Sequence, residues 1–503
     1  MEKRAFDNYK HAMRRKVFTL AFMVVCVTLS AQRFNGFIHS DFSGIIGARV
    51  QPASIAGSPY KWDVSLINAN FFVTNNIARL ENDGESTVIR RFIDDRTKFL
   101  QANVGVGGLS VLISLPRNQA IGLQYQLRGH ASANNFSPNF ISQVDRFTDP
   151  RVVNSVVENE SGQMAAALWR ELSFTYAAVV WDDGYNRWKV GLTAKMINTY
   201  GSAFFELNDL DYAINGSGIA AFTNIQANFG YSANLDPYDG FAGDQSLSGL
   251  PPKNAFSAAF DAGVVFERRA SRPAPRSQAG TRLEPDVDYE FRVSASITDL
   301  GIMEFAQGDA STLVSRLRPG LGTSIDFDAL LSGVEGFSSL RDSVNTFAET
   351  EQLSGRYKIS MPTALHLNYD YNFGNDWYLN ANALVDLTGL MPVDYRLNYL
   401  HNLTITPRWE QNRQALYLPV YVNQIGNIHL GVAARFGIIT FGTQNLGTLF
   451  TSKDTSAGFF FTLNLNQLVA NSAKPYCFGT SRGSGMTRTK RKPLYKRKKF
   501  LFF

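Results

Sequence analysis

Strict alternation of apolar and polar side chains is the dominant pattern along the chain. In RWKVGLTAKMINTY (187–200) every second residue from Trp188 to Met196 is apolar, and the residues between them are polar or small. DYEFRVSASITD (288–299), with Tyr289 on the apolar face, and LHLNYDYNF (365–373) repeat the pattern. A period of two is typical of a β-strand with one oily and one wet face. The same alternation recurs in AIGLQYQLRG, ELSFTYAAVV, DWYLNANALVDL, NIHLGVAARFG and GFFFTLNL.

Short turn signals separate several of these segments, namely PRNQ at 116–119, DDGYN at 182–186 and GND at 374–376. Strands joined by such turns pair as antiparallel hairpins. Many segments reach about ten residues, the length of a tilted membrane-spanning strand, whereas strands of soluble sheets average about five or six. We therefore predict an all-β fold, a transmembrane antiparallel β-barrel of about 14 strands with short helical inserts. A secreted array of β-sandwiches is the alternative, because its strands also alternate.

Three inserts interrupt the alternation. Residues 134–168 are partly helical in their period, and residues 326–350 place apolar side chains three or four positions apart, as an amphipathic helix does. Residues 270–286 are rich in proline and polar residues and predict a flexible loop. The helix within 326–350 has three alternative positions: over the barrel mouth as a lid, inside the barrel as a plug, or packed in a surface loop.

The two ends of the chain differ from its body. Residues 1–31 have the layout of a cleaved signal peptide, with a basic start, an apolar run and small residues before the cut; a membrane anchor is the alternative. An N-terminal periplasmic segment or hatch follows at 32–60, then an outer-membrane barrel at 61–468 and a basic periplasmic tail at 469–503. The small residues and prolines before Trp62 suit a hatch inside the barrel or an extended linker equally.

Charge supports this division. The chain carries a formal net charge of +6, with +4 on the first 32 residues and +10 on residues 474–503, so the residues between carry about −8. We expect the basic tail to meet anionic lipid headgroups, cell-wall carboxylates or the acidic face of an envelope protein. Basic runs of this kind are also typical of nucleic-acid binding, but export through the signal peptide argues against nucleic acid as a partner.

Motifs for catalysis, cofactors or metal ions are sparse. The chain has only 6 His and 2 Cys, and GTSRG (479–483) fits the GxSxG pattern without the strand and helix that must flank its serine. His366, His401 and His429 lie in separate alternating segments, and we interpret them as wall residues rather than catalytic bases. We therefore predict that the protein is not an enzyme and has no cofactor or metal site.

Charged side chains on the polar faces are the candidates for the barrel lining. They would either form a charged lumen that selects ions or anionic substrates, or pair across strands and fill the lumen. The lumen-lining candidates are Arg128, Lys189, Lys195, Arg292, His366, Asp370 and Arg435.

Two stretches resemble a known family. GFIHSDFSGIIGARVQPASIAGSPYKWDVSLINANFFVTNN (36–76) and MPTALHLNYDYNF (361–373) are similar to segments of an uncharacterised family of Bacteroidetes outer-membrane proteins. More distantly, QPASIAG (51–57) resembles the Asn-Pro-Ala segment that opens the long-chain fatty-acid transporter barrels and the shuttle barrel of type IX secretion, with Gln51 in place of the Asn. The resemblance implies a barrel in the outer membrane of a Gram-negative bacterium, in contact with lipid, and implies no particular reaction.

Two functions follow as hypotheses. The first is a channel or transporter for a small solute, with apolar solutes included because of the distant similarity to fatty-acid transporters. The second is a structural or secretion-associated partner protein, whose barrel is filled and whose loops and tail bind other envelope proteins. Abundant lumen charge with little plug favours the first hypothesis, and an element packed inside the barrel favours the second.

Overall fold

The computed structural model describes residues 36–82, 87–91, 96–138, 154–214, 220–238, 256–269, 289–318, 324–325, 334, 336–411, 413–447, 453–454 and 456–468. The predicted signal peptide, the basic tail and the loop predicted at 270–286 lie outside these residues. Within them, no helix is both long enough and apolar enough to cross a membrane.

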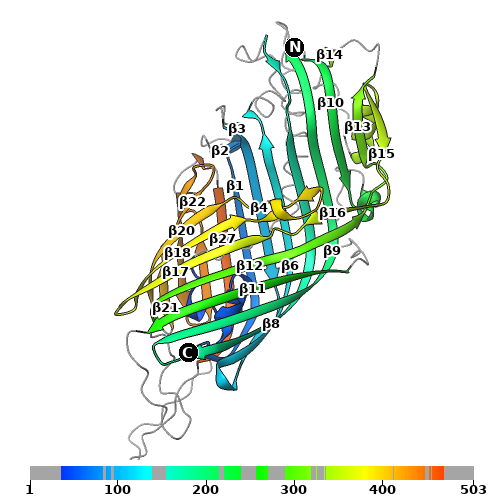
Figure 1. Ribbon diagram of the computed structural model, residues 1–503. Coiled ribbons are helices and arrows are strands. Elements are labelled where there is room, and N and C mark those ends of the chain that lie inside the picture. Colours follow the sequence, from blue (N-terminus) through cyan, green and yellow to red (C-terminus); the bar gives the residue numbers. More distant parts are fainter. Residues whose placement is uncertain are drawn as a thin grey trace, which may run out of the picture.

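The fold is a closed ring of antiparallel strands (Figure 1). The ring closes where β1 (Tyr60–Asn75) pairs with β27 (Ser456–Leu468) along almost the whole length of both strands. It contains fourteen barrel strands, three of them broken into two shorter segments, which confirms the predicted barrel and its strand number. In ring order these are β1, β4 (Lys98–Gly107) with β5 (Ser110–Leu115), β6 (Gln119–Phe136), β8 (Gly162–Asp182), β9 (Asn186–Ile214), β11 (Phe256–Arg269), β12 (Tyr289–Ala306), β17 (Ala364–Gly374), β18 (Trp377–Asp386), β20 (Asn402–Glu410), β21 (Gln414–Tyr417) with β22 (Val420–Asn423), β23 (Ile428–Leu430) with β24 (Val432–Phe436), β25 (Ile439–Thr443) and β27.

The predicted alternation is visible in the burial of side chains. On β9, Lys189, Thr193 and Lys195 point into the barrel and are buried, whereas Leu192 between them is 66% exposed on the outer face. Aromatic side chains gather on the outer face close to the short turns between strands, as interfacial belts of membrane barrels do. These are Tyr176, Trp181, Tyr185, Trp188, Phe373, Trp377 and Phe436.

Additional strands extend the sheet at the end opposite the short turns. The first half of β9 pairs with β11, and its second half pairs with β10 (Ala220–Tyr231). Figure 1 shows β10 projecting beyond the ring at the upper end of the view. An apolar cluster that includes Leu210, Phe229 and Val314 holds this extension together. Its other elements are β7 (Val156–Val157), β13 (Thr312–Leu317), β14 (Ser324–Ile325), α4 (Phe337–Asn345) and β15 (Ala348–Gln352).

Two of the predicted inserts differ from the structure. The prediction of partly helical structure through residues 162–168 was wrong, because these residues continue β8 with alternating buried positions at Ala165 and Ala167. The predicted amphipathic helix is limited to α4, which packs Leu340 and Val344 against the apolar cluster of the extension. The helix therefore belongs to the surface extension; residues 326–333 lie outside the described residues.

Small elements complete the fold. A separate three-stranded sheet is formed by β2 (Ala78–Asn82), β3 (Thr87–Arg91) and β26 (Lys453–Asp454). The strand β16 (Arg356–Ser360) pairs with the end of β12 and, in parallel, with β19 (Tyr395–Arg396). Two short 3-10 helices outside the lumen are η3 (Pro116–Asn118) and η4 (Ala233–Tyr238).

One strand end is reversed relative to the prediction. Tyr289 was assigned to the outer, apolar face of its strand, but it is buried inside the barrel. The pairing of β12 with β11 changes register between Phe291 and Tyr289, which places an extra residue in the ladder and turns Tyr289 inward. There its hydroxyl accepts a hydrogen bond from Arg408 at 3.0 Å.

Candidate functional site

The N-terminal segment, residues 36–59, lies inside the barrel, and we call it the plug. It is built from two short 3-10 helices, η1 (Asp41–Arg49) and η2 (Pro52–Ile55). A kink at Gly44, with φ 58° and ψ −133°, splits η1 into two parts, a conformation that favours glycine. Most plug side chains are buried, so the segment is a folded filling of the lumen that continues directly into β1.

Glycines in the barrel wall make room for the plug. A Cβ atom on Gly191 of β9 would overlap the plug backbone at Ala53, and a Cβ atom on Gly122 of β6 would lie 2.6 Å from Cδ1 of Ile45. A larger residue at 191 would collide with the plug backbone, and one at 122 would require the end of the Ile45 side chain to shift. The wall and the plug therefore fit each other at the level of single methyl groups.

Gln51 connects the plug to two neighbouring barrel strands. Its Nε2 donates to the backbone carbonyl of Val264 on β11 at 3.2 Å and to that of Ala295 on β12 at 3.1 Å. Its Oε1 accepts from the backbone amide of Ala53 at 3.2 Å. Space for this side chain exists because residue 263 is a glycine. A Cβ atom at that position would overlap the amide of Gln51. Gln51 thus forms hydrogen bonds directly with backbone groups of the wall.

Charged groups hold the other half of the plug. Asp41 lies 2.5 Å from Arg292, whose guanidinium also donates to the backbone carbonyl of His39 at 2.9 Å. The backbone amide of Ile45 donates to Asp63 of β1 at 2.9 Å. These contacts are polar and join the plug to wall residues that include one about 250 positions away along the chain.

A second segment crosses the lumen at a different height. Residues 387–401, which we call the crossing loop, join β18 to β20 and include η6 (Thr388–Leu390) and β19. The carbonyl of Asn398 lies 2.8 Å from Nε2 of His130 on β6, and the amide of Leu400 donates to Oε1 of Gln101 on β4 at 2.8 Å. The ring of Tyr399 packs edge-on against His130.

The contacts of the crossing loop lie on the far side of the barrel from its two ends. Around the ring of fourteen barrel strands, β6 is six positions from β18 and seven from β20. The loop therefore spans the full width of the lumen and does not fold back over the strands that it connects.

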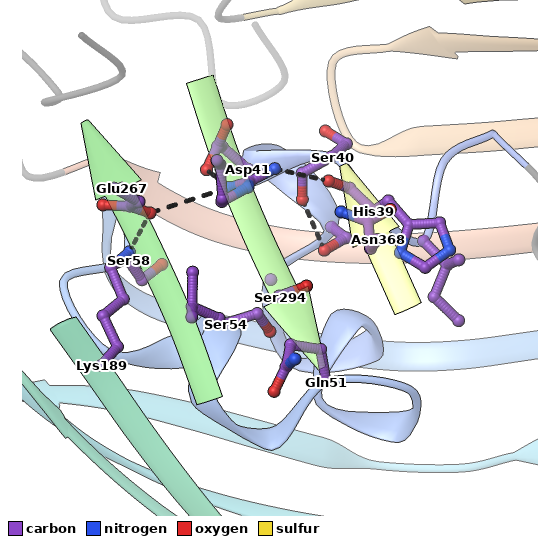
Figure 2. Close-up of a pocket in the computed structure, with 15 residues that line it drawn as sticks. His39, Ser40, Asp41, Gln51, Ser54, Ser58, Lys189, Glu267, Ser294 and Asn368 are labelled. Atoms are coloured by element: carbon purple, nitrogen blue, oxygen red, sulfur yellow. Dashed lines mark hydrogen bonds and ion pairs between the residues drawn. The ribbon is translucent and has the colours of Figure 1, made fainter. Parts of the chain in front are cut away.

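Two small cavities inside the barrel lie against the plug, each of about 30 Å³, enough for one or two water molecules. The first lies between the plug and the strands β9, β11 and β12, and Figure 2 shows Asp41 and Gln51 of the plug beside Lys189 and Glu267 of the wall. The second is bounded by plug residues including Arg49, by the wall, and by Tyr399 of the crossing loop. The plug and the crossing loop therefore occupy the lumen at two heights, with the second cavity between them.

Ion pairs line the lumen from β6 round to β24, and we call this set the ion-pair belt. Its N···O distances run from 2.5 to 3.9 Å, and almost every member is buried. Within the described residues the belt joins seven cations to seven carboxylates, so its formal charges balance. The cations are Arg128, Arg187, Lys189, Lys195, Arg292, Arg408 and Arg435; the carboxylates are Asp41, Glu171, Asp261, Glu267, Asp299, Asp370 and Glu410.

All seven residues proposed from the sequence point into the barrel and are buried. Six of them belong to the ion-pair belt: Arg128, Lys189, Lys195, Arg292, Asp370 and Arg435. The seventh, His366, has Nε2 at 3.3 Å from the hydroxyl of Thr298 and lines the second cavity. Of the two alternatives raised for these residues, the structure has the charges paired across strands.

Sequence reasoning missed several partners of these residues. Arg187 lies on the polar face of the alternating segment 187–200 but was not among the candidates, and Glu267 lies on β11, outside the segments used for the prediction. Asp299 has a positive φ of 58° at an irregularity of β12, so the period of two fails at that point. The available signal was the presence of Asp and Glu residues on the polar faces of strands. That signal does not show which strand supplies the carboxylate partner of a given cation.

Groups suited to catalysis or metal binding are few in the part of the chain that the structure describes. No group of three or more His, Cys, Asp or Glu residues there is arranged to hold a metal ion. The hydroxyl of Ser456 lies 2.8 Å from Nε2 of His429 and 2.6 Å from the hydroxyl of Thr74. Ser456 and His429 are both buried against the wall, so this pair presents no accessible nucleophile. His401, the third histidine considered, accepts a hydrogen bond from the amide of Asp386 at 3.0 Å.

Comparison with solved structures finds other barrels. The Ralstonia pickettii toluene transporter TbuX has 10% identity over 84% of this chain and 94% of its own, with a TM-score of 0.40. A Pseudomonas aeruginosa FadL homologue has 13% identity over 83% and 93%, with a TM-score of 0.38. The Pseudomonas putida toluene transporter TodX has 10% identity over 87% and 93%, with a TM-score of 0.33. TM-scores this low carry no argument about this chain, so its fold is assigned from its own strand pairing.

Comparison with family models gives a clearer result. No curated protein matches the chain significantly. The model of a family of unknown function, DUF5723, matches residues 52–443, which include the last third of the plug, the crossing loop and every barrel strand except β27. The predicted resemblance to an uncharacterised family is thereby confirmed, and the chain belongs to the DUF5723 family.

Proposed function

We propose that this protein is an outer-membrane barrel that carries a small polar solute across the membrane when the plug and the crossing loop move aside. The observation that carries the proposal is the cavity between these two segments, which both of them and the barrel wall line together. Each segment is held to the wall by hydrogen bonds, ion pairs and ring contacts. Either one can therefore move without breaking a barrel strand.

The location follows from the outer face of the ring. Exposed apolar side chains cover it on many strands, including Leu123 of β6, Phe174 of β8 and Leu192 of β9. A soluble protein seldom exposes an apolar surface of this extent, whereas a lipid-facing belt requires it. With the predicted signal peptide, this supports the outer membrane of a Gram-negative bacterium.

The lining favours a polar solute over an apolar one. Both cavities are bounded largely by charged or hydrogen-bonding side chains, such as His39, Gln51 and Asn382. An apolar solute at these places would leave buried polar groups without partners, which is unfavourable. The apolar solute suggested by the distant sequence similarity is therefore the less supported choice.

The second candidate is a structural or secretion-associated partner whose barrel stays filled. The observation that favours it is the ion-pair belt, in which charges within the lumen satisfy each other rather than face an aqueous path. Under this alternative the plug and the crossing loop never move, and the exposed loops are the functional surface.

Single-channel conductance of the refolded mature protein in a planar bilayer separates the two candidates. Gly191→Ala should displace the plug by pushing a methyl group into its backbone at Ala53. Asn398→Gly with Tyr399→Ala should release the crossing loop, because the Asn398 side chain bonds to Asn134, Asp386 and Thr388. Gly201→Ala, also on β9, is the matched control, since its added Cβ would lie 3.6 Å from the nearest atoms.

Two closures in series predict a specific pattern. The unsubstituted protein, the Gly201→Ala control and each closure variant alone should conduct rarely, and the variant with both closures released should show stable openings. Silence of the combined variant, shown to be folded by its heat-dependent migration on a gel, would reject the conduit and favour the filled partner protein.

A further inference from the structure

Amide side chains dominate the lumen face opposite the ion-pair belt. On the adjacent barrel strands β27, β1 and β4, which also carry the buried charged residues Asp63 and Lys98, six inward positions are occupied by uncharged polar residues, each at least nine-tenths buried. We call this set the amide face. It consists of Asn68, Asn70, Gln101, Asn103, Thr462 and Asn464.

Register brings these residues together. Asn68 on β1 lies opposite Thr462 on β27, and the next inward position of β1 is Asn70. On the other side of β1, Asn103 and Gln101 occupy successive inward positions of β4. Gly107, the β4 residue opposite Asn68, has no side chain, and the Asn68 amide occupies that space. The amide face is therefore one continuous patch across three neighbouring strands.

The amide face lies between the two closures. Along β1, Asp63 accepts a hydrogen bond from the plug, Asn68 and Asn70 follow, and Thr74 pairs with Gln101 of β4. Gln101 in turn accepts a hydrogen bond from the crossing loop. The patch therefore lines one side of the lumen at the heights between the two closures.

Several polar atoms of the amide face have no hydrogen-bond partner within the part of the chain that the structure describes. Buried amides in folded proteins are nearly always paired with protein, water or ligand. An unpaired set on one patch, aimed into the lumen, is therefore arranged to bond to a guest. The atoms are Oδ1 of Asn68, both Oδ1 and Nδ2 of Asn70, Nε2 of Gln101, Nδ2 of Asn103, Oγ1 of Thr462 and Oδ1 of Asn464.

The chemistry of the guest follows from both halves of the lumen. The amide face offers donors and acceptors without charge, and the facing ion-pair belt joins equal numbers of cations and carboxylates. We infer that the amide face is a binding site for a small uncharged solute with several hydroxyl groups, of the polyol or monosaccharide class. This rests on the proposed conduit function and specifies its substrate class.

Flux measurements with three probes of equal size test the assignment. Liposomes containing the full chain with both closures released are exposed to glucose, to the anion gluconate and to the cation glucosamine, and swelling is recorded. Glucose should enter about tenfold faster than either charged probe, because the charges of the ion-pair belt are already paired with each other and transfer of a further charge into the lumen is costly. Replacing Asn70 and Asn103 by leucine in the same protein should lower glucose entry by about tenfold, as expected for the loss of two hydrogen bonds.

Controls separate this inference from the conduit itself. Asn224→Leu, on β10 of the extension, is the matched control and should leave glucose entry unchanged. Entry of all three probes at equal rates, or glucose entry unaffected by the leucine substitutions, would overturn the amide-face assignment while leaving the conduit in place. Absence of entry for every probe would instead reject the conduit.

A binding readout on the full chain with both closures released, and with Asn70 and Asn103 unchanged, protects the test against misfolded leucine variants. Glucose should raise the midpoint of thermal unfolding in a saturable manner, and gluconate and glucosamine at the same concentrations should not. Equal shifts with all three probes would contradict the inference even if every leucine variant failed to fold.

Discussion

Buried charge in the ion-pair belt is stable because each of its members has an opposite partner in contact. Arg128 is the clearest case, since its guanidinium lies 2.7 Å from Glu171 and 2.7 Å from Asp299 and all three side chains are buried. Desolvation of these groups is costly, and the pairing offsets that cost only while both signs are present. The ion-pair belt is therefore sensitive to loss of a single member.

We expect Arg128→Met to lower the free energy of unfolding by about 3–5 kcal/mol, because two carboxylates then stay buried with only Lys195 to compensate Asp299. The change is measured as the shift of the urea midpoint in lipid or detergent. Arg316→Met is the matched control, since the Arg316–Glu349 pair is exposed and should be nearly neutral. Equal shifts for the two variants would show that the belt contributes little to stability.

Single residues also show where sequence reasoning reached its limit. The period of two placed Arg128, Lys189 and Lys195 inside the barrel, because alternation alone determines which face a residue occupies. It failed at Tyr289, and gave no account of Asp299, because each lies at an irregularity of β12 that shifts the period by one. A bulge of this kind depends on the paired strand, which a single strand's pattern does not contain.

At the scale of elements, the plug and the crossing loop use different means to close the same lumen. The plug relies on shape, with its backbone pressed against wall glycines, and on a few polar anchors such as Gln51. The crossing loop relies on bonds and ring contacts with side chains on the opposite wall, such as His130. Conditions that change charge should therefore affect the plug and the crossing loop differently.

Acid should loosen the plug through His39. Burial, followed by repulsion from His366, Arg292 and Arg408, lowers the pKa of His39 from 6.5 to about 3. A docked plug therefore resists protonation that a released plug, with an ordinary pKa, accepts. Protonation of His39 does not oppose docking of the plug above about pH 6.5. As the pH falls from there towards 3, the free energy of docking becomes less favourable by about 1.4 kcal/mol per pH unit.

The measurement uses the variant with only the crossing loop released, in which the plug alone closes the lumen. Its open probability in a bilayer should rise from pH 7.5 to pH 5, and His39→Asn should remove most of that rise. An unchanged pH response in the His39→Asn protein would assign the effect to other groups.

The two closures also differ in how far the sequence could predict them. The plug was one of two alternatives for residues 32–60, because a run of small residues fits a hatch and a linker equally. What distinguishes them is Gly191 and Gly122, which lie far along the chain and meet the plug only in the folded barrel. The crossing loop was not foreseen, since its bonds join residues such as Gln101 and Leu400, 299 positions apart.

At the scale of the whole molecule, the barrel has an apolar outside and a polar inside, the reverse of a soluble protein. The outer face presents side chains such as Leu172, Leu192 and Phe260, and the inner face carries the ion-pair belt and the amide face. Alternation made this arrangement predictable from the sequence, because each strand supplies both faces at once.

A charge on the outer belt should be destabilising in proportion to its depth in the membrane. Leu192→Arg, in the middle of the apolar stretch of β9, should cost about 2–4 kcal/mol of stability in lipid, and Tyr185→Arg, at the turn between β8 and β9, should cost about 0–1 kcal/mol. Urea unfolding in lipid vesicles measures both. Equal costs at the two positions would mean that the apolar belt is not centred on Leu192.

The position of the plug has a consequence for the order in which the protein assembles. The plug is the first described part of the chain, yet its docking surface is shared among β6, β9, β11 and β12, and Gln51 bonds to a carbonyl 244 positions away. That surface does not exist until those strands stand side by side. The first segment of this barrel to be made is therefore among the last to reach its place, and a nascent barrel is open through its centre before it seals itself.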